Sequence, residues 1–130
     1  RLGTQRIHHA YAYSSLFKQN GLLALGTDFP VEDIDPLKTF YAAVFRLLPT
    51  NTNAKAFLPN EALSAQEALK AMTIWAAISN FEEAQKGSLE IGKQADFVLL
   101  NQDLLKVNEK NAAKTTVTAT YLAGKLVYQK

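Results

Sequence analysis

The sequence contains no cysteine and carries little net charge, and each of these absences excludes a class of protein. Without cysteine, the chain forms neither disulfide bonds nor thiolate metal sites. The formal net charge is only +2, and the 14 lysine and arginine residues are scattered, so no nucleic-acid partner is expected. No apolar run approaches the roughly 20 residues of a membrane-spanning helix, so no membrane partner is expected either.

The length and the apolar content indicate one core. A chain of 130 residues with 48% hydrophobic residues is long enough to bury a globular interior. The first residue is Arg1 rather than methionine. We therefore expect the sequence to be the C-terminal part of a longer protein.

The most informative stretch is residues 22–30. Leu22 to Leu25 form an apolar run that ends in Gly26, Thr27, Asp28, Phe29 and Pro30. A short apolar run bounded by glycine and proline predicts a buried strand of a parallel sheet, here over residues 22–27. Asp28 falls just past the carboxyl end of that strand, where ligands bind in parallel α/β folds. It is a candidate metal ligand or general base; the alternative is a helix N-cap or a turn-forming aspartate.

These residues carry a resemblance to a family. Gly26 to Glu32, followed by Asp35-Pro36-Leu37, resembles the last barrel strand of metal-dependent amidohydrolases, and specifically the amidohydrolase 3 or YtcJ-like group. The resemblance continues through Ser64 to Ala77 and through Gly87 to Leu100, so it covers most of residues 22–128. Its most specific part is Gly-Ser-Leu-Glu-Ile-Gly-Lys-Gln-Ala-Asp at residues 87–96.

The resemblance implies an α/β fold in two parts. Residues 1–85 would be the C-terminal part of a (β/α)8 catalytic barrel, including its last β/α unit. Residues 86–130 would be the C-terminal half of a small flanking β-sandwich whose other half comes from the N-terminus. A whole barrel takes roughly 250 residues, so an unpaired strand and a sheet with an exposed edge are expected in this chain.

The resemblance also implies a chemistry. The whole enzyme would hydrolyse C–N bonds other than peptide bonds, in amides or cyclic amides, with zinc or another divalent metal. Asp28 would contact the metal, act as base on the metal-activated water and later pass the proton to the leaving group. The family's other metal ligands, a His-x-His pair and further His or carboxylated Lys, belong to strands that this sequence lacks. Hydrolase zinc sites need at least three protein ligands, so the chain alone is expected to be inactive and to bind no metal.

Other polar residues have simpler interpretations. His8 and His9 are adjacent and converge poorly on one ion, so a structural or exposed role is favoured. Glu32 either belongs to a solvated acidic turn, which we favour, or lines the mouth of the site. We assign turn formation to Asp96, and caps and turns to Ser64 and Ser88.

Local signals predict the remaining elements. Asp35 and Pro36 start a helix over residues 36–48, and Ser64 with Glu67 forms a capping box that opens a helix reaching about residue 80. Strands are expected over residues 96–100, 117–122 and 126–128, with a hairpin turn at residues 123–125. The remaining expectations are a helical turn at 16–19 capped by Ser14 or Ser15 and ended by Asn20-Gly21, a short extended segment at 89–91, and loops at 49–55 and 106–114.

Two functions remain open. The first is the hydrolase described above, which takes a small-molecule substrate and is expected to be a homo-oligomer. The alternative is a non-catalytic fragment or retired module that serves in assembly or oligomerisation.

Overall fold

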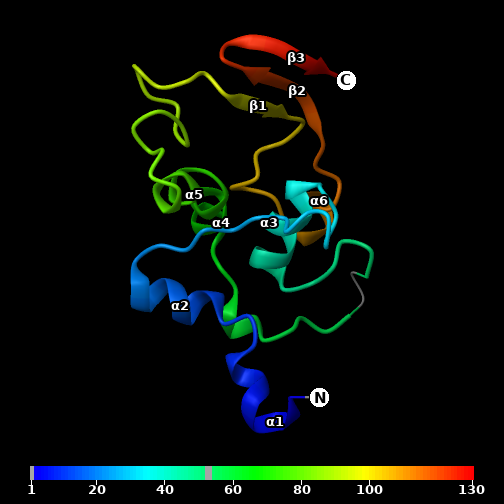
Figure 1. Ribbon diagram of the computed structural model, residues 1–130. Helices are drawn as coiled ribbons and strands as arrows, with labels where there is room; N and C mark the ends of the chain where they lie inside the picture. Colours follow the sequence, from blue (N-terminus) through cyan, green and yellow to red (C-terminus); the bar gives the residue numbers. More distant parts are fainter. Residues whose placement is uncertain (1, 52–53) are drawn as a thin grey trace.

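The computed structural model describes residues 2–51 and 54–130. A three-stranded sheet forms one end of the molecule, a group of helices forms the middle, and α1 lies at the end farthest from the sheet (Figure 1). The elements follow in the order α1 (Gly3–Arg6), η1 (Ile7–His9), α2 (Tyr13–Asn20), α3 (Pro36–Phe45), η2 (Pro59–Glu61), α4 (Ala65–Met72), α5 (Ile74–Ser79), β1 (Phe97–Leu100), α6 (Glu109–Ala112), β2 (Val117–Leu122) and β3 (Lys125–Gln129).

The sheet is an antiparallel meander in the order β1-β2-β3. Phe97 pairs with Tyr121 across β1 and β2, and their rings stack at 4.5 Å between centroids. Ala123 and Gly124 both have positive φ, which matches the twist of a two-residue hairpin between β2 and β3. The three predicted strands are confirmed, and β3 is slightly longer than predicted. Every residue of β3 is exposed, so the expected open edge is confirmed.

Helix α3 begins as predicted. Asp35 is its N-cap and accepts a 2.9 Å hydrogen bond from the Leu37 amide, while Pro36 occupies the first turn. The helix ends at Phe45 rather than at residue 48. Arg46 adopts a left-handed φ of 58°, and its amide closes the helix on the Ala42 carbonyl at 3.0 Å. The apolar periodicity continues past that point, which is why the sequence predicted three more helical residues.

The predicted capping box is confirmed at α4, but the single helix expected beyond it is divided. Ser64 accepts the Glu67 amide, and the Glu67 carboxylate accepts the Ser64 amide. Thr73 then breaks the helix with φ −125° and ψ −97°, and its hydroxyl donates to the Leu69 carbonyl at 2.7 Å. Helix α5 follows, and its Trp75 stacks on Phe17 of α2 at 5.0 Å, so Trp75 has a packing role.

The core lies between α3 and α4. Phe40 and Ala43 of α3 pack with Leu63, Ala68 and Leu104, and all five are buried. The Leu63 amide donates to the Ala43 carbonyl at 3.0 Å, which aligns the start of α4 with α3. Burying a side chain such as Phe40 stabilises the fold by about 1.5–3 kcal/mol. Among residues 2–51 and 54–130, no helix is long and apolar enough to cross a membrane.

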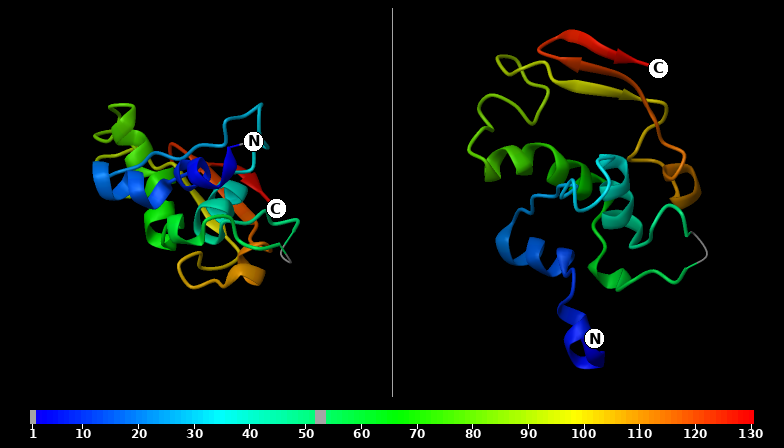
Figure 2. Two further views of the ribbon diagram at one scale, coloured as in Figure 1. Left: turned by 90° about the horizontal axis from the view of Figure 1, so that it is seen from below. Right: turned by 45° about the vertical axis from the view of Figure 1, so that its right-hand side comes forward.

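The prediction of a buried strand over residues 22–27 is wrong for this structure. The segment runs from the end of α2 toward α3 without a sheet partner, and it is only half buried at best (Figures 1 and 2). It is tied to α4 by one hydrogen bond of 3.0 Å from the Leu25 amide to the Ala71 carbonyl. A parallel strand needs neighbouring strands to pair with, and no parallel pair exists among the described residues.

One shorter prediction also needs correction: the loop at 106–114 contains the one-turn helix α6, capped by the Asn108 side chain. Residues 89 and 90 carry no regular secondary structure, and the turn around Gly92 begins at Ile91. The loop over residues 49–55 is irregular where described; residues 52 and 53 lie outside the described part.

Helix α2 is longer than the predicted turn at 16–19, and its N-cap is Ala12 rather than Ser14 or Ser15. The capping acid comes from η2 instead, because Glu61 accepts hydrogen bonds from the Ser15 amide at 2.9 Å and hydroxyl at 2.6 Å. The predicted left-handed end at Gly21 is confirmed.

Candidate functional site

Asp28 presents a free carboxylate at the end of the 22–27 segment. The residue is exposed and has a positive φ of 55°, a conformation that aspartate tolerates better than most residues. Its backbone carbonyl accepts the Val31 amide at 2.8 Å and so forms the turn. Its carboxylate makes no hydrogen bond with the described residues. The helix N-cap is Asp35, and Thr27 supplies the side-chain oxygen that bonds the Phe29 amide. Among the described contacts, the Asp28 side chain therefore neither caps the helix nor bonds the turn.

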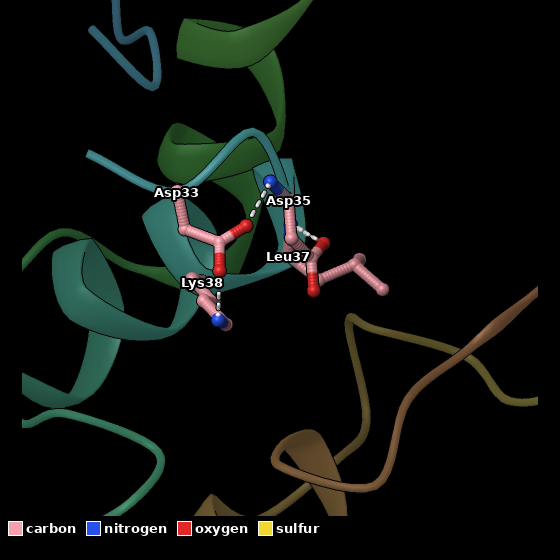
Figure 3. Close-up of polar contacts among 4 residues, drawn as sticks. All are labelled: Asp33, Asp35, Leu37 and Lys38. Carbon is pink, nitrogen blue, oxygen red and sulfur yellow. Dashed lines mark hydrogen bonds and ion pairs between the residues drawn. The ribbon is translucent and has the colours of Figure 1, made fainter. Parts of the chain in front are cut away.

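The acids that follow Asp28 are engaged in local structure. Figure 3 shows Asp33 turned toward Lys38 and toward the Asp35 amide, with nitrogen-to-oxygen distances of 2.5 and 3.0 Å. The hydrogen bond from Lys38 is the main reason why the pKa of Asp33 lies below its usual value. Asp35 is occupied as the cap of α3. Of this acidic run, Asp28 and Glu32 are the carboxylates that remain without a hydrogen bond among the described residues.

A cavity of about 650 Å³ adjoins this turn. It lies between Leu25-Gly26, α3 and the connection that follows α3, and its volume is in the range of small-molecule sites. Glu32 borders the cavity although it is exposed, so it lies both in a solvated turn and at the edge of a concave surface. Asp28 does not line the cavity but follows Gly26 by two residues.

Arg46 is the residue on this cavity that the sequence analysis missed. Its side chain is only 7% exposed, and it lies at the junction of α3 with the following connection. The sequence does contain a signal for this residue, because Arg46 is the one charged residue in the run from Phe40 to Leu48. An isolated charge in an apolar run is costly to bury without partners.

The two histidines stay outside the site. His8 and His9 lie in η1 and are exposed, which confirms the interpretation given to them. Among residues 2–51 and 54–130, no group of three or more His, Cys, Asp or Glu side chains is placed to hold a metal ion. Asp28 therefore belongs to no such group among the described residues.

The polar residues of the Gly-Lys motif have structural roles. The Asp96 carboxylate accepts the Ala123 amide at 2.7 Å, which confirms its assignment as a turn-forming residue. Ser88 accepts a 2.6 Å hydrogen bond from the Lys93 ammonium, which also pairs with Glu90 at 2.9 Å. Ser64 is the cap of α4, as predicted.

The fold resembles part of a solved amidohydrolase structure. An amidohydrolase from Thermotoga maritima MSB8 superimposes with a TM-score of 0.65 and 25% identity, over 92% of this chain and 26% of that one. The chain belongs to the amidohydrolase family, because the family model described as "Amidohydrolase family" matches residues 1–128. The resemblance seen in the sequence is thereby confirmed.

Curated relatives agree. Protein LONG AFTER FAR-RED 3 of Arabidopsis thaliana is 41% identical over 129 residues, which are 98% of this chain and 22% of that protein. The putative amidohydrolase YtcJ of Bacillus subtilis is 31% identical over 130 residues, 100% of this chain and 25% of that protein. N-substituted formamide deformylase of Arthrobacter pascens is 32% identical over 109 residues, 83% of this chain and 19% of that protein. The chain therefore spans a quarter or less of the length of these relatives.

Proposed function

We propose that the whole protein is a metal-dependent hydrolase of C–N bonds other than peptide bonds, and that Asp28 is its base. The observation that carries the proposal is the Asp28 carboxylate, which is exposed and has no hydrogen-bond partner among the described residues. Membership of the amidohydrolase family supports the reaction class. The relative named as a deformylase of N-substituted formamides supports small amides as substrates.

We further propose that residues 1–85 complete a (β/α)8 barrel and that residues 86–130 complete a composite β-sandwich. The 22–27 segment would become the last barrel strand once neighbouring strands supply its hydrogen-bond partners. Asp28 would then lie at the carboxyl end of that strand, where barrel enzymes place catalytic groups.

The residues present fit one part of a metal site. Carboxylate oxygens are ligands of Zn²⁺, and Asp28 has its carboxylate free for that role. No group of three or more potential ligands forms among the described residues, so further ligands would come from the part of the protein that this chain does not span. When bound, zinc or another divalent ion would supply Lewis acidity, which lowers the pKa of water to about 7.

In this mechanism Asp28 handles the proton. Its carboxylate takes a proton from the water as the water oxygen attacks the amide carbonyl carbon. It then gives that proton to the amide nitrogen as the C–N bond breaks. One water is consumed, and a carboxylic acid and an amine are released. The exposure of Asp28 leaves it accessible to both water and substrate.

The test uses the full-length protein supplied with zinc and a panel of N-substituted formamides and acetamides, with the released amine as the readout. We expect Asp28→Asn to lower kcat by about 10²–10⁴-fold, the usual contribution of a positioned acid or base. Glu83→Gln is the matched control, because Glu83 is exposed and lies away from the cavity. Unchanged activity of the Asp28 variant, or no amide hydrolysis by the zinc-loaded wild type, would refute the proposal.

The alternative role in assembly has one observation in its favour. Leu122, Leu126, Val127 and Tyr128 of the β2–β3 hairpin are exposed apolar residues. Apolar residues gathered on an edge hairpin favour contact with another part of the protein or with a second copy. Light scattering on the full-length protein tests the homo-oligomer that we propose, and a monomer would exclude it.

A further inference from the structure

Arg46 carries a positive charge into the interior without a paired acid. Among the described residues, no carboxylate lies within 4.0 Å of its guanidinium, and the ion pairs of the structure are all made by lysines. The acid that responds to this charge from farther away is Glu61. The pKa of Glu61 lies below its usual value mainly because Ser15 donates hydrogen bonds to it, and in smaller part because of Lys18 and Arg46. Both Glu61 oxygens already accept hydrogen bonds from Ser15. Buried charges in proteins are normally paired, so Arg46 is an exception that needs an explanation.

The guanidinium of Arg46 is held in one orientation. Its Nε donates to the Phe57 carbonyl at 3.0 Å, and its Nη2 donates to the Tyr11 carbonyl at 2.9 Å. The Tyr13 ring lies 4.8 Å from the guanidinium carbon, and the Phe57 ring lies 5.8 Å from it. The third nitrogen, Nη1, has no hydrogen-bond partner among residues 2–51 and 54–130. These contacts fix the plane of the group and leave the donors of Nη1 for another acceptor.

The surroundings suit a small molecule that is partly apolar. Arg46 borders the cavity of about 650 Å³, together with the aromatic residues Tyr11, Tyr13 and Phe57. Aromatic walls with a small number of fixed polar groups are typical of ligand sites, because the wall contributes affinity and the polar groups set the orientation.

Two acids also border this cavity, and their positions are compatible with an anion at Arg46. Glu32 and Asp33 precede α3, whereas Arg46 follows it, and a helix of this length separates its two ends by roughly 15 Å. Asp33 is moreover paired with Lys38. Glu32 and Asp33 are exposed, and exposed charges separated by more than about 8–10 Å are largely screened at physiological salt, so the repulsion from these acids is weakened.

We propose that the cavity binds the carboxylate of a small ligand with an apolar or aromatic body, and that Arg46 is its anchor. A guanidinium presents several N–H donors in a fixed plane and prefers the planar carboxylate as its partner. Because its orientation is already set, little conformational freedom is lost when the ligand binds. The site is separate from the proposed base: it requires no catalysis by Asp28.

The test measures binding of phenylacetate to the full-length protein by calorimetry, with benzyl alcohol as the neutral ligand of similar size. We expect phenylacetate to bind and benzyl alcohol to bind at least about tenfold more weakly, since the alcohol lacks the charge-assisted hydrogen bonds. Arg46→Met should weaken phenylacetate binding at least tenfold. Arg46→Lys keeps the charge but loses the planar arrangement of N–H donors, so its affinity for phenylacetate should lie between those of the wild type and Arg46→Met. Lys18→Met removes one positive charge from α2, outside the cavity, and should leave binding unchanged.

Two further measurements keep the outcome decisive. If Arg46→Met does not fold, hydrogen exchange on the wild type takes its place, and phenylacetate should protect residues 46–51 and 54–57. Asp28→Asn separates this site from the proposed catalytic one, because a carboxylate held at Arg46 keeps its affinity in that variant even if catalysis is lost or was never present. Three results would overturn the proposal: absence of phenylacetate binding, binding by Arg46→Met and Arg46→Lys that is as tight as binding by the wild type, or protection confined to another region.

Discussion

The Asp96 carboxylate accepts a 2.7 Å hydrogen bond from the backbone amide of Ala123, 27 residues further along the chain. This contact, together with one from the Gly124 amide to the Ala95 carbonyl at 2.9 Å, fastens the β2–β3 turn to the segment that enters β1. The most specific motif of the family thus ends in a residue that organises the sheet.

Replacement of Asp96 should therefore weaken the sheet. We expect Asp96→Ala to lower the free energy of unfolding by about 1.5–3 kcal/mol, the range for a hydrogen bond to a charged group. Asp96→Asn keeps an acceptor and should cost less. Urea unfolding of the full-length protein, with hydrogen exchange of residues 117–129 to locate the effect, is the measurement. Equal stability of the alanine variant and the wild type would contradict this role.

Gly87 should not tolerate a side chain. A Cβ there would lie 2.7 Å from the Ala77 Cβ and 3.0 Å from the Ile74 Cα, and the residue has a φ of 91°. Gly92 provides the matched control, because its φ of 94° is similar but its Cβ would meet nothing within 4 Å. We expect Gly87→Ala to be less stable than Gly92→Ala by about 1–3 kcal/mol, the usual cost of overpacking. Similar melting temperatures for the two variants would mean that residues 73–77 yield to the added methyl group.

The stability of the N-terminal half should fall in acid because of Glu61. The hydrogen bonds from Ser15 hold the pKa of Glu61 below its ordinary value of 4.5. The folded state therefore binds this proton less readily than the unfolded state does. The stabilising contribution is complete above about pH 4.5 and is lost as the pH falls through the lower pKa of the folded state.

The test compares melting temperatures of the wild type, Glu61→Gln and Glu83→Gln between about pH 3 and pH 6, the region where carboxylates titrate. The advantage of the wild type over Glu61→Gln should be largest near pH 6 and should shrink toward pH 3. Glu83→Gln should follow the wild type throughout. A constant difference across this range would rule out the linkage.

Residues 1–130 expressed alone should be oligomeric or poorly folded. The 22–27 segment has no sheet partner, and β3 is exposed along its whole length. Unpaired edges of this kind favour pairing between chains. Light scattering combined with thermal unfolding decides the matter, and a monomer that melts cooperatively would show that this chain holds a complete core of its own.

The elements that could be predicted from the sequence are those whose determinants lie close together in the chain. Asp35 and Pro36 mark the start of α3, Ser64 and Glu67 mark the start of α4, and Ala123 and Gly124 form the hairpin turn. Each signal acts within a few residues, so it works whatever surrounds it.

The misplaced elements depend on contacts that are distant in sequence. The end of α3 at Arg46 coincides with bonds from its side chain to Tyr11 and Phe57. The cap of α2 comes from Glu61, 46 residues beyond Ser15. The 22–27 segment has the composition of a strand, but a strand forms only where neighbouring strands can pair with it, and the described residues contain none beside this segment. Asp28 could be singled out because it follows that apolar run directly, whereas Arg46 acquires its surroundings only through folding.

The layout of the sheet has a consequence for the order in which the molecule forms. Its three strands follow one another within residues 97–129, and each pairs with the next. The two-residue turn between β2 and β3 loses little entropy on closure, and hairpins assemble in microseconds. The β2–β3 hairpin can therefore acquire its register before the helices dock. The 22–27 segment has no strand close by in the sequence to pair with, so it can become a strand only after neighbouring strands from another part of the protein have formed.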